Sequence, residues 1–114
     1  MPMEMTSLAG LAEQHLAIAR QAGSGRSAHT VYGGHDKTLR QTLIALAGGR
    51  ELDEHENPGE ATLYVLSGHV RLVAGTHEQD GTSGDLLTVP DRRHRLRAVD
   101  DSVVLLTVAK TGSR

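Results

Sequence analysis

From residue 29 onwards, the chain consists of short runs rich in β-branched and aliphatic residues, with turn residues between nearly all of them. Pairs such as Gly48-Gly49 and Asp100-Asp101 interrupt the runs. Apolar residues between the runs do not follow the spacing of a helix. This pattern predicts an antiparallel sandwich or barrel rather than alternating βαβ units. The predicted strands cover residues 29–32, 38–46, 51–55, 61–66, 70–74, 86–89, 94–99 and 103–109.

Residues 8–22 follow a different period, with apolar side chains at three- and four-residue steps. A Thr-Ser pair directly before them can cap the first turn, and two glycines soon after them can end the last one. These features predict an amphipathic helix of about four turns. We therefore expect residues 1–28 to form a helix and linker, and residues 29–114 to form the strand-rich part of a single domain. Because the apolar stripe is weak and rich in alanine, the helix must pack on the sheet or on a second subunit.

The composition limits both the core and the partners of the protein. Phe and Trp are absent and Tyr occurs only twice, so Leu, Val, Ile and Ala must fill the interior. The formal net charge is -2 at pH 7. We expect no nucleic-acid partner, because the residues that neutralise phosphates and stack on bases are both scarce. The chain has no cysteine, which excludes disulfides and thiolate chemistry.

Neither secretion nor membrane insertion is indicated by the sequence. The first residues lack a basic stretch followed by an apolar one, and the chain has no apolar run of about 18 residues. We therefore expect a cytoplasmic protein that does not contact a membrane.

The last predicted strand, residues 103–109, is apolar on both faces, so we expect it to be buried under the helix or at a dimer contact. These features predict a homodimer.

Potential ligand side chains gather between residues 49 and 68, around a Pro-Gly turn. A second stretch, residues 84–98, adds His94 at the start of a predicted strand. Imidazole and carboxylate groups are the usual ligands of catalytic iron and zinc. If the two stretches are neighbours in the fold, they form one metal or substrate site. The donors of the first stretch are His55, Glu56, Asn57 and Glu60.

Together the two stretches resemble the two motifs of the cupins, small jelly-roll barrels that usually bind one metal. In the first motif, Gly49 precedes His55 by the usual spacing and Gly68 closes the motif. In the second motif, a Gly-Asp pair and His94 are in place, in a loop one residue shorter than usual. The resemblance covers about residues 40–109. It implies an all-β fold, a cupin jelly-roll β-barrel, to which this chain adds an N-terminal α-helix.

The ligand set implied by the resemblance is incomplete. Asn57 stands at the position of the second histidine of the family, and Ala61 stands at the position of its glutamate. Glu60 comes one residue early, so its side chain would point away from the barrel interior in a regular strand. It can turn inward if the strand begins only at Ala61, because Pro58-Gly59 permits irregular backbone just before it.

Two functions are compatible with this pattern. The first is a stand-alone cupin that binds a small polar molecule in its barrel without converting it, as a sensor or regulatory module. Its pocket would be lined by Asn57, Leu63 and Val65. The incomplete ligand set favours this function, with one divalent transition metal bound or none.

The alternative is a metal-dependent enzyme of the cupin type, a dioxygenase or an isomerase. His55, Glu60 and His94 would hold one Fe, Mn, Ni or Zn ion, and Asn57 would be a weaker donor. Open positions on the metal would then take the substrate.

Charged residues surround His94, and a further histidine lies in a polar segment. The arginines at 92, 93, 95 and 97 stand among aspartates, which predicts a solvated charged rim. Within that rim, Arg93 or Arg95 can hold a substrate carboxylate. His77 belongs to residues 76–80, a polar segment that predicts a surface loop.

Overall fold

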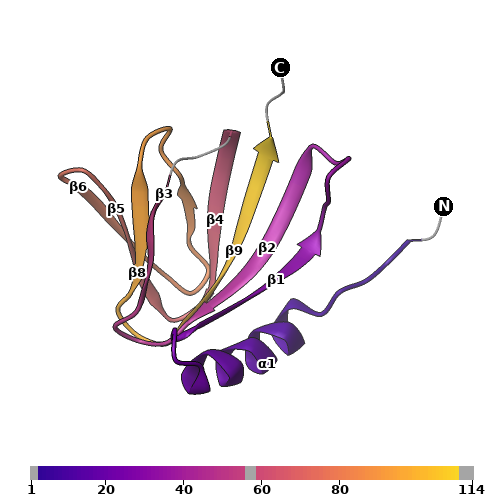
Figure 1. Cartoon of the computed structure of the whole chain (residues 1–114), viewed down its shortest axis with the longest axis horizontal. Coiled ribbons are helices and arrows are strands. Elements are labelled where there is room, and N and C mark those ends of the chain that lie inside the picture. Colours follow the sequence, from indigo (N-terminus) through magenta and orange to yellow (C-terminus); the bar gives the residue numbers. More distant parts are fainter. Residues whose placement is uncertain (1–2, 56–58, 111–114) are drawn as a thin grey trace.

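The computed structural model describes residues 3–55 and 59–110, without the side chains of Glu54 and His55. Within these ranges a helix is followed by a series of strands, as the sequence predicts (Figure 1). β1 begins earlier than predicted, because part of the Gly-Ser linker pairs with β2. The elements are α1 (Leu8–Gln21), β1 (Arg26–Tyr32), β2 (Leu39–Leu46), β3 (Glu51–His55), β4 (Gly59–Ser67), β5 (His69–Ala74), β6 (His77–Thr82), β7 (Leu86–Thr88), β8 (His94–Ala98) and β9 (Ser102–Lys110).

The strands form two antiparallel sheets that face each other. The five-stranded sheet has the order β1-β2-β9-β4-β7, and the four-stranded sheet has the order β3-β8-β5-β6. Within the described residues no strand pairs across from one sheet to the other, so the expected closed barrel is replaced by an open sandwich. One reason is the shortness of β7, the strand that contacts β6. Its three residues offer little backbone for pairing.

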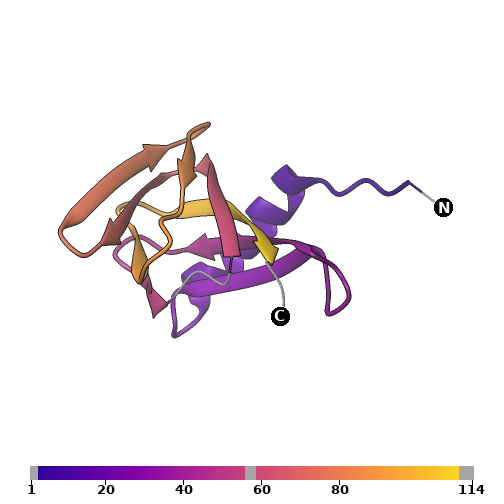
Figure 2. The same cartoon turned by 90° about the horizontal axis from the view of Figure 1, so that it is seen from above.

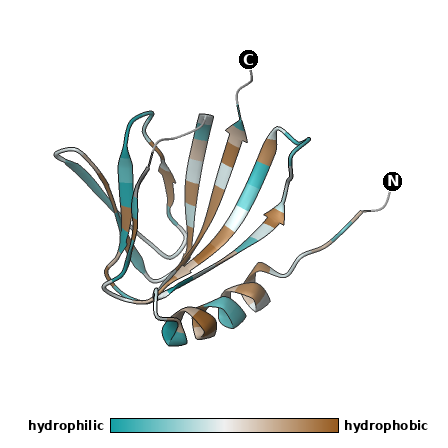
Figure 3. Cartoon of the chain, in the orientation of Figure 1, coloured by the Kyte–Doolittle hydropathy of each residue, from teal (hydrophilic) through white to brown (hydrophobic). Residues whose placement is uncertain are grey.

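Aliphatic side chains fill the space between the two sheets, as the composition requires. Successive residues of a strand point to opposite faces, and Figure 3 shows hydrophobic bands along β2, β4 and β9. Burying one Leu or Val side chain fully contributes about 1.5–3 kcal/mol. The core between the sheets consists of Ile44, Leu46, Leu63, Val65, Val70, Leu72, Leu87, Val89, Leu96, Ala98 and Val104, with Leu52, Ala61 and Leu106 packed against it.

α1 covers the outer face of the five-stranded sheet, beside β1 and β2 (Figure 1). Ser7 caps the helix, because its Oγ accepts the Gly10 N–H at 3.1 Å. Figure 2 shows the segment that precedes α1 leading away from both sheets. In the described part of the chain, α1 is too short and too polar to cross a membrane.

β9 is buried on both faces, which confirms the expectation from its sequence. It lies in the middle of the five-stranded sheet, between β2 and β4. Val104 and Leu106 belong to the core between the sheets, whereas Val103 and Leu105 pack in the cluster under α1. The helix of the same chain therefore covers the second apolar face of this strand.

β6 corrects the prediction of a polar loop over residues 76–80. The segment forms an edge strand that pairs with β5 from His69↔Thr82 to Ala74↔His77. Its own sequence has few of the β-branched and apolar residues that signal a strand. Pairing is instead stabilised across the two strands, because Arg71 Nε donates to Asp80 Oδ1 at 2.7 Å.

Candidate functional site

His94 is the best-defined polar residue between the sheets. It begins β8 and alternates with Leu96 and Ala98, so its side chain lies on the inner face of the four-stranded sheet. The side chain is buried, with 4% of the residue exposed. Nδ1 donates a hydrogen bond of 2.8 Å to the Arg92 carbonyl, which fixes the ring orientation. In a neutral ring, Nε2 is then the nitrogen that carries the acceptor lone pair.

His55 is directly opposite His94 in the register of β3 and β8. The pairing is irregular between Leu52 and His55, which is how an extra residue is accommodated in β3. The two stretches predicted to meet are thus neighbouring strands of one sheet. The side chain of His55 lies outside the described part of the chain, and Asn57 lies in the undescribed segment 56–58.

Glu60 is not brought together with His94. β4 begins at Gly59, before Glu60, so Glu60 takes part in the regular alternation of the strand. It is paired with Ala109 of β9 and is exposed, on the face opposite to Ala61 and Leu63. The irregular start that would turn this carboxylate inward is absent from the described part of β4.

Leu63 and Val65, the two aliphatic residues predicted to line a pocket, lie on the inner face of β4. Their exposed fractions are 4% and 0%, and both pack within the core between the sheets. They therefore face the same interior as His94. Their own surface is covered by neighbouring aliphatic side chains.

A pocket of about 290 Å³ opens between β5, β6 and the end of β7. Its apolar part comes from Leu72, Ala74 and Pro90, and its polar part includes His77 and Gln79. It lies at the end of the sandwich where β8 begins and β5 turns into β6, which we call the His94 end. Thr88 and Glu78 complete the described lining.

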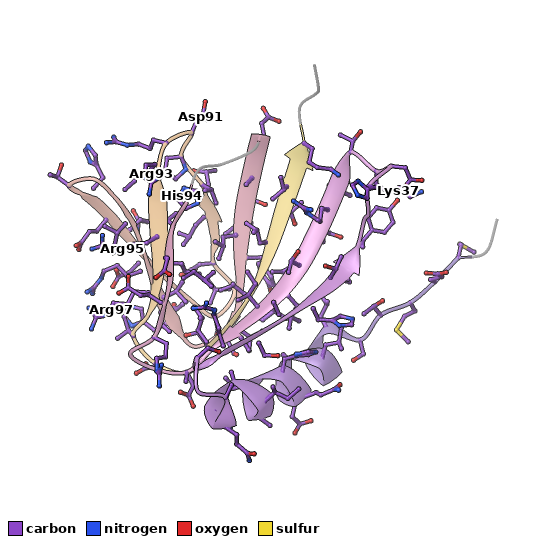
Figure 4. All side chains as sticks on the ribbon, in the orientation of Figure 1. Lys37, Asp91, Arg93, His94, Arg95 and Arg97 are labelled. Carbon is purple, nitrogen blue, oxygen red and sulfur yellow. The ribbon has the colours of Figure 1, made fainter. Side chains whose placement is uncertain are left out.

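The arginines near His94 lie mainly on the outer face of the four-stranded sheet. Figure 4 shows Arg95 and Arg97 along β8, directed away from the five-stranded sheet. Arg95 Nε is 3.5 Å from Glu51 Oε1, and Arg97 stands opposite Arg71 in the register. These positions agree with the expected solvated rim.

A tight ion-pair cluster accompanies this rim on β5 and β6. Asp80 accepts hydrogen bonds from Arg71, at 2.7 and 3.0 Å, and its Oδ2 is 2.7 Å from His69 Nε2. These contacts, first from Arg71 and then from His69, lower the pKa of Asp80 to about 2. The Asp80 carboxylate is thus engaged on the outer face, away from the pocket.

The family model of the cupin domain matches residues 42–109, more than half of the chain. The chain belongs to the cupin family. No curated protein matches this cupin in sequence.

Solved structures share the fold of this cupin at low sequence identity. A cupin superfamily protein from Desulfitobacterium hafniense is 19% identical, with a TM-score of 0.75 over 97% of this chain and 95% of that chain. A salicylate 1,2-dioxygenase from Pseudaminobacter salicylatoxidans is 17% identical, with a TM-score of 0.72 over 88% of this chain and 33% of that chain. The cupin domain of an XRE family transcriptional regulator from Enterobacter cloacae is 14% identical, with a TM-score of 0.65 over 76% of this chain and 98% of that chain. At these identities the likeness concerns the fold alone.

The described side chains of this cupin do not fit a metal centre. A catalytic metal site uses three or more protein donors. Among the side chains that the structure describes, no three His, Cys, Asp or Glu residues stand close enough to hold an ion. His94 contributes one imidazole, Ala61 has no donor, and the Glu60 carboxylate lies on the other face of its strand. No reaction step through a metal follows from this arrangement.

His77 is the site residue that sequence reasoning missed in this cupin. Its strand is an edge strand whose residues are nearly all polar, so no hydrophobic alternation marks it. The available signal was weak: His77, Gln79 and Gly81 recur every second residue, and all three are opposite inner-face residues of β5. Only the pairing with β5 reveals that His77 belongs to the pocket.

Proposed function

We propose that this cupin binds a small polar molecule at the His94 end of its sandwich and does not convert it. One observation carries the proposal. A buried, oriented histidine stands at the same end as an open pocket, while the only carboxylate predicted to complete a metal site, Glu60, is on the outer face. Such an arrangement can select a ligand through hydrogen bonds and shape.

Pocket chemistry supports binding of a molecule that is polar on one side. Leu72, Ala74 and Pro90 provide an apolar surface, and His77, Gln79 and Thr88 provide a small number of polar groups. A volume of about 290 Å³ suits a small metabolite. The likeness to the cupin domain of a transcriptional regulator agrees with a sensor role, and it does so by analogy of fold alone.

The enzymatic alternative has less support. The dioxygenase with this fold is a longer protein, and the cupin covers 33% of its chain. A metal-dependent reaction in this cupin would have to recruit His55 and residues of the segment 56–58 in addition to His94. No described residue favours that route over simple binding.

We also propose that the cupin forms a homodimer through the part of the five-stranded sheet that α1 leaves uncovered. Tyr64 and Leu86 are exposed on the outer side of β4 and β7, with 39% and 62% of their surface accessible. Met3 and Met5, ahead of α1, are 99% and 85% exposed. Burying these apolar side chains against a second copy is favourable. Light scattering at micromolar concentration should give a dimer mass, and a monomer mass would contradict the proposal.

The binding function is tested by asking what the purified protein retains. Untagged wild-type protein and the variant His94→Ala would be purified from the same cell type, and the small molecules released on denaturation would be quantified by mass spectrometry. We expect one polar compound enriched with the wild type and lost from the variant. The matched control is His35→Ala, which removes an exposed histidine from the β1–β2 connection.

Equal amounts of every released compound in wild type and His94→Ala would overturn the binding proposal. Because His94 is buried, circular dichroism must show that the variant is folded. If it is not, His94→Gln, which keeps polar atoms at this position, replaces it under the same criterion.

A further inference from the structure

The strand β6 adds a second polar wall to the His94 end. His77 is opposite Ala74 in the β5–β6 register, and Gln79 is opposite Leu72. Val73 is paired with Arg95 on the other side of β5, so one residue further along the same register Ala74 stands beside His94. Directly opposite residues point to the same face of a sheet. His94, Ala74 and His77 therefore form one row across the inner face.

Ala74 leaves room between the two histidines of this row. Neighbouring strands are about 4.8 Å apart, so the backbones of His94 and His77 are separated by about 10 Å. A larger side chain than alanine would fill the space between the rings. The pocket of about 290 Å³ includes Ala74 and His77 in its lining, so this row is open on the His77 side.

Arg92 brings a positive charge to the same place. Its carbonyl accepts the hydrogen bond from His94 Nδ1. Its Nη2 lies 2.8 Å from where a Cβ on Gly75 would stand, so the guanidinium rests on the turn between β5 and β6. Gly75 also has a φ of 61°, which suits glycine. Arg92 thus lies over the turn that joins Ala74 to His77, two residues of the pocket lining.

Three acidic side chains nearby, those of Asp80, Glu78 and Asp85, have partners outside the pocket. Asp80 is held by Arg71 and His69 on the outer face. Glu78 contributes to the pocket lining, but its Oε1 is 3.9 Å from Arg71 Nε on that outer face. Asp85 lines a neighbouring hollow and accepts the Thr82 N–H at 2.8 Å. The basic groups at this end of the sandwich include Arg92, His77 and the buried His94, and Glu78 is the carboxylate in the described pocket lining.

We propose that Arg92 and His77 form the recognition wall of this site and that its ligand is a small carboxylate with an apolar body. This inference rests on the proposed binding function. The carboxylate is held by Arg92 and by the ring of His77, and the apolar body lies on Leu72, Ala74 and Pro90. Arg92 is thereby chosen over Arg93 and Arg95, the two arginines that the sequence suggested for a substrate carboxylate.

Isovalerate is a suitable probe, because its branched chain matches the aliphatic floor, and isovaleramide is its uncharged counterpart. Binding would be measured by calorimetry and by titration of the histidine ring signals in NMR spectra. We expect isovalerate to shift the signals of His77 and His94 and to bind at least tenfold more tightly than isovaleramide. Hydrogen bonds to a charged group support a difference of about this size.

Two variants and one control complete the test. Arg92→Gln and His77→Ala each change an exposed side chain, so both should fold, and each should weaken isovalerate binding about tenfold. His35→Ala should bind as the wild type does. The proposal is overturned if isovalerate does not bind, if isovaleramide binds as tightly, or if either variant keeps wild-type affinity.

These outcomes differ from failure of the proposed function. If the wild type retains a polar compound that His94→Ala loses, but isovalerate does not bind, the proposed binding function is supported. In that case the proposed carboxylate ligand and the recognition wall of Arg92 and His77 are contradicted. If the wild type retains no such compound and isovalerate does not bind, both the binding function and the carboxylate proposal are contradicted.

Discussion

The two ends of the sandwich are built differently. At the turn end, where β4 meets β5 and β8 meets β9, the buried Ser102 and the partly exposed Asp101 each have several hydrogen-bond partners. Ser102 Oγ accepts the His69 N–H at 2.9 Å, and Asp101 accepts the Gly48 N–H at 2.8 Å and Arg20 Nε at 2.7 Å. At the His94 end, an open pocket replaces this closure, with an exposed histidine in its lining.

We infer from this difference that the turn end stabilises the fold and that the His94 end binds the ligand. The turn end ties α1 and both sheets together, so substitutions there should lower the free energy of unfolding. At the His94 end, substitutions of the exposed residues His77 and Arg92 should change ligand affinity and leave folding intact. The following substitutions test this division between the two ends.

The largest effect is expected from Gly68→Ala. Gly68 has a φ of 92°, and an added Cβ would overlap the Asp101 carbonyl and Ser102. We expect a loss of about 2–4 kcal/mol in the free energy of unfolding, from backbone strain together with the steric overlap. Urea denaturation followed by circular dichroism would measure it.

Gly84→Ala is the matched control for this substitution. Gly84 has nearly the same φ, 91°, but a Cβ there would meet no atom within 4 Å. Its cost should be about 1–2 kcal/mol, from the backbone conformation alone. Equal losses in the two variants would show that the turn end is not as tightly closed as described.

Ser102→Ala should have the next largest effect. The hydroxyl is buried, receives the His69 N–H and donates to the Asp100 carbonyl at 2.7 Å. Removing it leaves a partly buried N–H without its acceptor, which costs about 1–3 kcal/mol. Thermal and urea unfolding would be compared with Ser83→Ala, an exposed serine near β7. A Ser102→Ala variant as stable as Ser83→Ala would contradict the role of this hydroxyl.

The ion-pair cluster on the outer face predicts a smaller, pH-dependent effect. The pKa of Asp80 is about 2 in the folded protein, below its ordinary value of 3.8, mainly because of the Arg71 hydrogen bond. A lowered carboxyl pKa stabilises the fold above the ordinary pKa, and this contribution is lost as the pH falls from about 4 to about 2. The stability difference between wild type and Asp80→Asn should therefore be present at pH 7 and should shrink over that window.

Denaturation with urea at pH 7, 4 and 2.5 would follow this difference. Because Asp80 is partly exposed, solvent screening keeps the effect small. The comparison protein is Asp36→Asn, which changes an exposed aspartate of the β1–β2 connection. A difference for Asp80→Asn that is constant with pH would argue against the hydrogen-bonded cluster.

The smallest effect on folding is expected at the His94 end. His77→Ala should change the free energy of unfolding by less than about 0.5 kcal/mol, because His77 is exposed on an edge strand. The same denaturation assay measures it. A loss comparable with that of Ser102→Ala would mean that the two ends are not divided between stability and binding.

Much of the fold could be predicted from local sequence. Turn residues separated most of the strands, Ser7 marked the start of α1, and the two apolar faces of the last strand indicated cover on both sides. Closure of the sheets could not be predicted, because it depends on edge pairing and on the short β7. β6 was missed because its stability comes from Arg71 and Asp80 across the strand pair, not from its own propensity.

The site could be predicted only in part. The motif spacing placed His94 on a strand beside the strand of His55, and the register confirms that these strands are paired. The direction of Glu60 depended on where β4 begins, which the Pro-Gly turn left open. His77 gave no signal by itself, since its position in the pocket comes from pairing with Ala74.

The metal content of untagged protein tests whether this cupin binds its ligand through the His94 end without a catalytic metal. We expect substoichiometric Fe, Mn, Ni and Zn, and an unchanged amount of retained small molecule after treatment with a chelator. One equivalent of a single metal in the wild type, lost in both His55→Ala and His94→Ala, would contradict the claim and restore the enzyme alternative.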